Sequence, residues 1–321
     1  MRDRSSRIFV AGHAGLVGSA ITERLRALGY SNLLLPSRRE LDLTDRAAVA
    51  SFFAANKPQH IFLAAAKVGG IEANSTLPAE FIFQNILIQT NVIHEAWRSG
   101  VERLLFLGSS CIYPRLADQP IKESALLTGP LELTNRPYAV AKIAGIEMCW
   151  AYNRQYGTRF FAAMPCNLYG AGDNYDLQLS HLIPGLIRRM HKAKTDAADE
   201  VIVWGTGRPR REFLYSKDAA DACVFLMELP DTKFDELTAS KVQPPVVNVG
   251  PGEDLTILET AEKIAKVVGF TGKLTLDPSK PDGTPRKLLD VTLLTSLGWS
   301  PSTLLEVGLQ RSYEDFRSRF Q

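Results

Sequence analysis

The sequence predicts an α/β fold in which a doubly wound parallel sheet is followed by a smaller C-terminal α/β lobe. In the first half of the chain, short apolar runs alternate with amphipathic stretches, and the short runs are continuously apolar. Strands of that kind are buried on both faces, as in a parallel sheet covered by helices. Right-handed crossovers make such a sheet doubly wound. After about residue 165 the alternation loosens, which indicates a second, more irregular unit.

The elements follow from hydrophobic period and from turn and cap signals. The strands expected in the first half are 7–12, 32–36, 60–66, 103–110 and 159–165. The helices expected between them are 16–29, 44–56 with Thr44 as its N-cap, 79–99 and 138–156. In the second half we expect helices at 181–194, 216–229 and 256–269, strands at 201–205 and 246–250, and a polar loop at 277–287.

Composition excludes several classes of protein. The 37 basic and 35 acidic side chains leave a net charge of +2, so there is no global attraction to nucleic acid or to a membrane. The four cysteines have no CxxC spacing, so we expect no metal site and four reduced thiols. No signal peptide is recognisable and no run approaches 18 apolar residues. We therefore expect a cytoplasmic location.

A glycine-rich loop, Gly12-His-Ala-Gly15-Leu-Val-Gly18, follows the first strand and opens the first helix. Glycines at these positions allow a tight turn and close approach of the backbone to a pyrophosphate, which the helix N-terminus then faces. The loop predicts a dinucleotide site on a Rossmann-type sheet, with an ordinary turn as the alternative. Arg38 and Arg39, after the second strand, favour NADP over NAD because guanidinium groups bind a 2′-phosphate. A solvated basic turn is the alternative, and Asp42 is expected at the adenine edge.

Tyr138 and Lys142 stand at i and i+4 of a predicted helix, so they share one face. A neighbouring ammonium is expected to lower the pKa of the Tyr138 phenol, which makes it a useful general acid. Ser109 ends the preceding strand, and an extended chain there would place Ser109 and Cys111 on the same side. Ser, Tyr and Lys in this order, after a nucleotide loop, resemble the extended branch of the short-chain dehydrogenase/reductases. That resemblance implies that Lys142 also holds the nicotinamide ribose.

Longer stretches resemble the family of GDP-L-fucose synthases over nearly the whole chain. They are "AAAKVGGIEAN" (64–74), "LGSSCIYP" (107–114), "KIAGIEMCWAYNRQYG" (142–157), "NLYG" (167–170), "REFL" (211–214) and "SKPDGTPRKLLDV" (279–291). The resemblance implies NADPH-dependent 3,5-epimerisation and 4-keto reduction of GDP-4-keto-6-deoxy-D-mannose. It also implies a homodimer, with the 79–99 and 138–156 helices as candidate interface. A related nucleotide-sugar epimerase, dehydratase or reductase is the first alternative, and a non-catalytic NADP-binding regulator is the second.

The resemblance also assigns residues. Ser109, Cys111, Tyr138, Lys142 and His181 are the implied catalysts, with Cys111 the base and His181 the acid of the epimerisation. From the residues alone, Cys111 would be a buried packing thiol and His181 a helix-entry residue. The expected substrate residues are Ser109, Arg189, Trp204, Arg211, Lys280 and Asp282. The residues expected to bind NADP(H) are Gly12, His13, Ala14, Gly15, Leu16, Val17, Gly18, Arg38, Arg39, Asp42, Ala65, Leu107, Gly108, Ser109, Ser110, Tyr138, Lys142, Pro165, Asn167, Leu168 and His181.

The two halves of the chain thus receive different tasks. Residues 1–170 are expected to form the NADP-binding domain, and 171–321 mainly a substrate-binding lobe with some segments returning to the first domain. Ala14 stands where the family usually has Arg, Cys166 where it has Thr, and the 171–180 loop also diverges. These departures remove no proposed catalyst, and they leave room for a modified sugar substrate.

Overall fold

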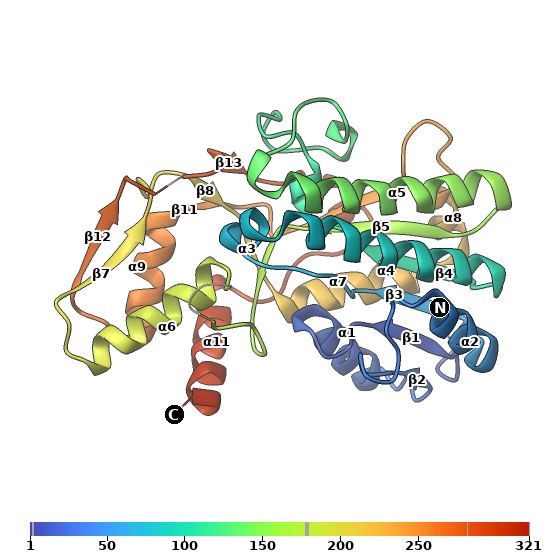
Figure 1. Ribbon diagram of the computed structural model, residues 1–321, viewed down its shortest axis with the longest axis horizontal. Helices are drawn as coiled ribbons and strands as arrows, with labels where there is room; N and C mark the ends of the chain where they lie inside the picture. The colour runs from blue at the N-terminus through green and yellow to red at the C-terminus, as the bar shows by residue number, and fades with distance from the viewer. Residues whose placement is uncertain (2, 177–179, 281, 321) are drawn as a thin grey trace.

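The computed structural model describes residues 1, 3–176, 180–280 and 282–320, so residues 177–179 of the divergent loop lie outside the described chain. Its centre is a six-stranded parallel sheet with helices on both faces, and short strands and three helices form a second group beside it (Figure 1). The α/β fold with a doubly wound parallel sheet is therefore confirmed.

The main sheet has one reversal of strand order. In space its strands are β10 (Val246–Val249), β5 (Phe160–Pro165), β4 (Arg103–Leu107), β3 (His60–Leu63), β1 (Ile8–Ala11) and β2 (Leu33–Leu34). All five pairings are parallel. The order reverses between β1 and β3, and ligands of such sheets bind beside the reversal, at the carboxyl ends of the strands.

Helices cover both faces of this sheet, as its continuously apolar strands require. On one face α4 (Pro78–Arg98) and α5 (Arg136–Tyr156) lie side by side, with α2 (Arg46–Asn56) against α4. On the other face α1 (Leu16–Ala27) packs against α7 (Ser216–Glu228). Shorter helices complete this part of the molecule: α3 (Ile71–Thr76), α8 (Asp231–Thr238) and α10 (Thr292–Ser296), with three-residue 3-10 turns η1 (Ser110–Ile112), η2 (Glu123–Ala125) and η3 (Leu133–Asn135).

A second hydrophobic core lies outside the main sheet. It joins α6 (Leu182–Thr195), α9 (Ile257–Val268) and α11 (Leu305–Phe320) through Leu186, Ile264 and Leu309, all with no exposed surface. The strands of this region are β6 (Asn167–Tyr169) with β9 (Phe213–Tyr215), β7 (Glu200–Trp204) with β12 (Lys273–Asp277), and β8 (Arg210–Arg211) between β11 (Leu255–Thr256) and β13 (Arg286–Lys287). The first core in turn includes α7 and β10 from the second half of the chain.

Two local predictions are wrong. Asp45, not Thr44, caps α2, because its carboxylate accepts hydrogen bonds from the N–H groups of Ala47 and Ala48 at 2.8 and 3.1 Å. The Thr44 hydroxyl instead donates to Asp42. The strand expected to run to residue 110 ends at Leu107, and η1 follows it. The expectation of an extended chain from Ser109 to Cys111 is therefore also wrong.

Candidate active site

The glycine loop forms a close-packed turn between β1 and α1. Gly12 has φ of +84°, and a Cβ added to it would lie 2.7 Å from the nitrogen of Ala65. A Cβ on Gly18 would lie 2.1 Å from the Gly12 carbonyl oxygen. Gly15 is the N-cap of α1, whose first turn carries no acidic side chain. This loop leaves no space for a side chain at Gly12 or Gly18, and the N-terminus of α1 opens from it. The loop therefore fits the pyrophosphate of a dinucleotide.

The basic turn after β2 contains an internal hydrogen bond to one of its own carboxylates. The Glu40 carboxylate accepts a hydrogen bond from the Ser37 N–H at 2.7 Å, and Arg38 and Arg39 between them are exposed. The Asp42 carboxylate accepts from the N–H and hydroxyl of Thr44. Two exposed guanidinium groups on this turn are suited to a ribose 2′-phosphate.

Four of the five predicted catalytic residues lie together where β4 ends. The Lys142 ammonium donates to the carbonyl of Leu107 at 2.8 Å and lies 5.8 Å from the centre of the Tyr138 ring. The Ser109 hydroxyl accepts from the Cys111 N–H at 3.5 Å and lies close enough to the Tyr138 phenol to lower its pKa. Turn η1 packs against α5, which brings the strand-end residues to the helix that carries Tyr138 and Lys142. A substrate carbonyl at this place would meet a hydroxyl and a phenol at once.

Burial dominates the proton affinities in this cluster. It lowers the pKa of Lys142 to about 8, against a smaller opposing effect of Cys111. Burial raises the pKa of Tyr138, with a second contribution from Cys111, and the nearby Ser109 hydroxyl only partly offsets it. The expected lowering of the Tyr138 pKa by Lys142 is therefore wrong, because Lys142 is not among the groups that shift this pKa and burial raises it. Tyr138 stays protonated at neutral pH, as a general acid must before it acts.

His181, the fifth predicted catalyst, makes no described contact with that cluster. It is exposed and forms the N-cap position of α6, where its carbonyl accepts from the Gly185 N–H. No interaction in the described part of the chain joins its side chain to Ser109, Cys111 or Tyr138. Its expected role rests on the resemblance.

The predicted substrate residues of the second half gather around the turn after β7. Trp204 is 53% exposed, and the Arg189 guanidinium and Lys280 ammonium lie 5.9 and 5.4 Å from the centre of its ring. Asp282 accepts from the N–H and hydroxyl of Thr206, and Arg211 reaches the Asp282 carbonyl at 3.5 Å. An aromatic face flanked by cations suits a nucleoside diphosphate.

The remaining predicted cofactor residues line the strand ends beside the glycine loop. Leu107 and Pro165 end β4 and β5, and Asn167 donates its side-chain N–H to the carbonyl of Glu212 at 2.9 Å. A Cβ on Gly108 would lie 2.0 Å from the Met164 side chain, so the chain passes the neighbouring strand closely there.

Two charged residues near the site were not predicted. Glu212 is fully buried, and its carboxylate accepts from the N–H groups of Gly252 and Leu289, while burial raises its pKa to about 7. Lys287 pairs with Arg211 between β13 and β8 and acts electrostatically on Cys111. Lys287 stands within the stretch "SKPDGTPRKLLDV", but a lysine in a polar segment is usually solvated, so only the pairing of distant strands reveals its position.

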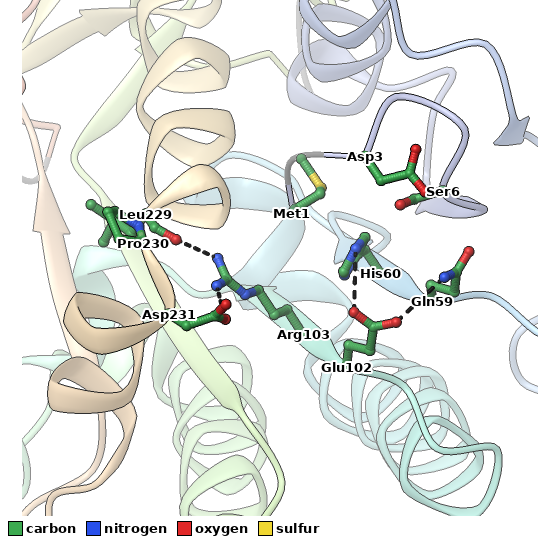
Figure 2. Close-up of a pocket in the computed structure, with 10 residues that line it drawn as sticks. All are labelled: Met1, Asp3, Ser6, Gln59, His60, Glu102, Arg103, Leu229, Pro230 and Asp231. Carbon is green, nitrogen blue, oxygen red and sulfur yellow. Dashed lines mark hydrogen bonds and ion pairs between the residues drawn. The ribbon is translucent and has the colours of Figure 1, made fainter.

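A cavity of about 390 Å³ lies at the opposite, amino-terminal edge of the sheet (Figure 2). His60 and Arg103, which begin β3 and β4, line it, and Arg103 donates to Leu229 and Asp231. None of the predicted site residues lines this cavity, and we assign the reaction to the carboxyl edge. Among the described residues, no group of three His, Cys, Asp or Glu is placed to hold a metal ion. No described helix is long and apolar enough to cross a membrane.

Comparison with known proteins agrees with this geometry. Residues 8–250 match the model of the NAD dependent epimerase/dehydratase family. The chain is 57% identical to the putative GDP-L-fucose synthase 2 of Arabidopsis thaliana, over 98% of this chain and 92% of the relative. It is 54% identical to the GDP-L-fucose synthase of Escherichia coli, over 97% and 96%. A GDP-mannoheptose C4 reductase from Campylobacter jejuni, solved with NADP bound, has a TM-score of 0.89 at 37% identity, covering 99% and 100%.

The identity to these two GDP-L-fucose synthases is thus higher than to the heptose reductase, and it extends over both lobes. The expected family and NADP(H) as cofactor are confirmed. The chain belongs to the NAD dependent epimerase/dehydratase family and, within it, to the GDP-L-fucose synthases.

Proposed function

We propose that Ser109, Cys111, Tyr138, Lys142 and His181 carry out the reaction of this family on a single bound GDP-sugar. The activity is the NADPH-dependent conversion of GDP-4-keto-6-deoxy-D-mannose to GDP-L-fucose, by 3,5-epimerisation and then reduction at C4. The observation that carries the assignment of residues is the gathering of the first four at the carboxyl end of β4.

In the epimerisation, the C4 ketone makes the hydrogens on C3 and C5 removable as protons. Cys111 removes each proton as a thiolate, and the charge moves to the C4 oxygen as an enolate. Ser109 and Tyr138 stabilise that oxygen with hydrogen bonds. His181 then returns a proton to the opposite face of the carbon, so no atom is gained or lost.

In the reduction, the same oxygen site is used again. Bound NADPH supplies a hydride for C4. Tyr138 gives its proton to the oxygen, and Lys142, held by the Leu107 carbonyl, provides the positive charge that supports the resulting phenolate. One pair of donors to one oxygen therefore serves both half-reactions.

The two hydrophobic cores support a division of tasks, with NADP(H) on the main sheet within 1–170 and the GDP end on the smaller lobe within 171–321. Arg189, Trp204, Lys280, Arg211 and Asp282 provide the cations, the aromatic face and the hydrogen-bonding groups for GDP. Segments of the second half that join the first core, such as β10, connect the two parts.

The whole assignment is tested by NADPH oxidation in deuterium oxide with GDP-4-keto-6-deoxy-D-mannose. We expect GDP-L-fucose with deuterium at both C3 and C5. NADPH oxidation without deuterium uptake would leave a plain C4 reductase, the activity of the Campylobacter jejuni heptose enzyme.

The roles of single residues are tested by Cys111→Ser, assayed with that substrate and with an already epimerised 4-keto sugar. Activity on the first is expected to fall at least 100-fold, while reduction of the second survives, because the oxygen site and Lys142 remain. Equal loss of both activities would contradict the division of labour.

We further propose that the protein is a cytoplasmic homodimer. Its four cysteines are buried free thiols, which suits a reducing compartment. The candidate interface is the outer face of α4 and α5, where Phe83, Val140 and Tyr156 are 63, 39 and 45% exposed.

A further inference from the structure

Lys287 pairs with Arg211 on the neighbouring strands β13 and β8, and its ammonium has no described partner of its own. Its side chain is half-buried, and within the described residues it makes no hydrogen bond and no ion pair. Burial lowers the pKa of Lys287, and Arg211 lowers it further, while Cys111 and Glu132 raise it. Glu132 already pairs with Arg115 at 3.1 Å. A half-buried cation left without a partner costs stability, so its position calls for a functional explanation.

The backbone fixes where Lys287 stands. The N–H of Leu288 donates to the side chain of Gln119, and the Leu288 carbonyl accepts from the Ile121 N–H, at 2.9 and 2.8 Å. The Ile121 carbonyl in turn accepts from the Asp290 N–H at 2.8 Å. The segment after Lys287 is therefore bonded to the loop that follows Cys111.

A side-chain link fastens the same two segments closer to Cys111. Tyr113, two residues beyond Cys111 and 3% exposed, donates its hydroxyl to Asn248 at 2.6 Å. Asn248 donates its side-chain N–H to the carbonyls of Ile121 and Asp290, at 2.9 and 3.1 Å. Both segments are thus bonded to Asn248 of β10, which fixes the backbone segment of Lys287 relative to that of Cys111.

The groups around Cys111 shift the pKa of its thiol in opposite directions. Burial raises the pKa of the Cys111 thiol, which by itself would keep it protonated and unable to act as a base. Lys287 is the largest influence in the opposite direction, ahead of the Ser109 hydrogen bond and of Lys142. A cation beside a thiol favours the thiolate.

We propose that Lys287 is a positioning residue for the epimerisation, whose ammonium stabilises the thiolate of Cys111 as it accepts protons from C3 and C5. The inference rests on the proposed role of Cys111 as the base. In the step, the proton moves from carbon to sulfur and back toward the sugar or solvent, while Lys287 keeps its own protons. The strand pairing of Lys287 with Arg211 also links the strand of this cation to the GDP-binding cluster.

The test measures the thiol directly. Thiolate absorbance near 240 nm is titrated against pH for the ligand-free wild type and Lys287→Met, each minus its Cys111→Ser counterpart. We expect Lys287→Met to raise the apparent pKa of Cys111 by about one unit or more, a tenfold loss of thiolate at a given pH below it. Deuterium incorporation at C3 and C5 at pH 7.5 falls by a similar factor and recovers as the pH is raised.

Controls separate charge from structure. Lys287→Arg keeps the cation and is expected to retain the wild-type titration within about half a unit. Arg286→Met removes a charge from the same strand, where Arg286 is exposed and paired with Asp254, and is expected to change nothing. If Lys287→Met does not fold, Lys287→Gln replaces it.

The outcomes also separate this inference from the proposed function. An unchanged Cys111 titration in the neutral Lys287 variant would overturn the inference and leave Lys287 a ligand of the substrate diphosphate. The same result follows if Arg286→Met shifts the titration equally. Full deuterium exchange by Cys111→Ser would instead overturn the role of Cys111, whatever Lys287 does to its pKa.

Discussion

At the scale of single residues, the site depends on charges taken out of water. Lys142 is 3% exposed, and its only described hydrogen bond is to the Leu107 carbonyl, a neutral acceptor. With no carboxylate partner, the ammonium is destabilised by burial, and its pKa falls to about 8. The group that supports Tyr138 is therefore charged at neutral pH by a small margin.

This margin predicts an alkaline limit for the reduction. Because the pKa of Lys142 is lowered, its proton is lost as the pH rises through about 8, and the positive charge needed beside Tyr138 goes with it. We expect kcat/KM for reduction of the epimerised substrate to fall about tenfold per unit above pH 8. Measured pH profiles should show this limb moving to higher pH in Lys142→Arg, since arginine stays charged. A limb that keeps its position in Lys142→Arg would assign it to another group.

At the scale of elements, the packing of the glycine loop depends on positions where the turn leaves no space for a side chain. Gly18 belongs to the first turn of α1, yet its missing side chain decides how closely β1 and α1 approach, because a Cβ there would overlap the Gly12 carbonyl oxygen at 2.1 Å. Gly15 differs, since a Cβ on it would meet the same oxygen at an ordinary 3.5 Å.

We expect substitution of these two glycines by alanine to have different outcomes for stability. Gly18→Ala forces the loop apart, so we expect about 1–3 kcal/mol lower stability and at least a tenfold weaker affinity for NADPH. Gly15→Ala, whose φ of −82° suits alanine, should keep the wild-type melting temperature. Calorimetric melting and fluorescence titration with NADPH measure the two effects. Equal melting temperatures for Gly18→Ala and wild type would show that the loop is not close-packed.

Elements with a local signal could be predicted, and elements made by distant pairing could not. The strands and helices of the main sheet follow from apolar runs, and Thr256 with Glu259 forms the capping box that opens α9. Helix α11 had a signal that was not used, since Leu309, Tyr313 and Phe316 recur at helical spacing.

The charged strands had no such signal. The two residues of β8 and the two of β13 are all basic, and they form strands because β8 pairs with β13 on one side and with β11 on the other. The position of Lys287 is a property of that pairing. Likewise, η1 brings Cys111 toward Ser109 by a turn. The extended strand that was expected to put both side chains on one face does not exist, so their proximity depends on this turn.

At the scale of the whole molecule, α4 and α5 lie side by side as an outer layer over the sheet (Figure 1). Their exposed apolar residues make this layer unlike an ordinary solvated surface. Beside the exposed Phe83 and Val140, an aromatic cluster spans the two helices. The rings of Trp97 and Tyr156 stack at 4.2 Å, and Tyr152 packs against Trp97 at 5.7 Å. An apolar and aromatic face on two long parallel-packed helices is the composition of a protein interface.

This face predicts a homodimer in which α4 and α5 of two copies meet, because a two-fold interface brings the same apolar patch together from both sides. Light scattering after size exclusion should give about twice the 35.5 kDa of the chain. Phe83→Asp combined with Val140→Glu buries unpaired charges at that interface, so the variant should run as a monomer at micromolar concentration. Leu304→Glu, at an apolar residue just before α11 that is 72% exposed, is the control and should remain dimeric. A wild-type protein of 35.5 kDa, or a doubly substituted protein that still dimerises, would place the interface elsewhere or remove it.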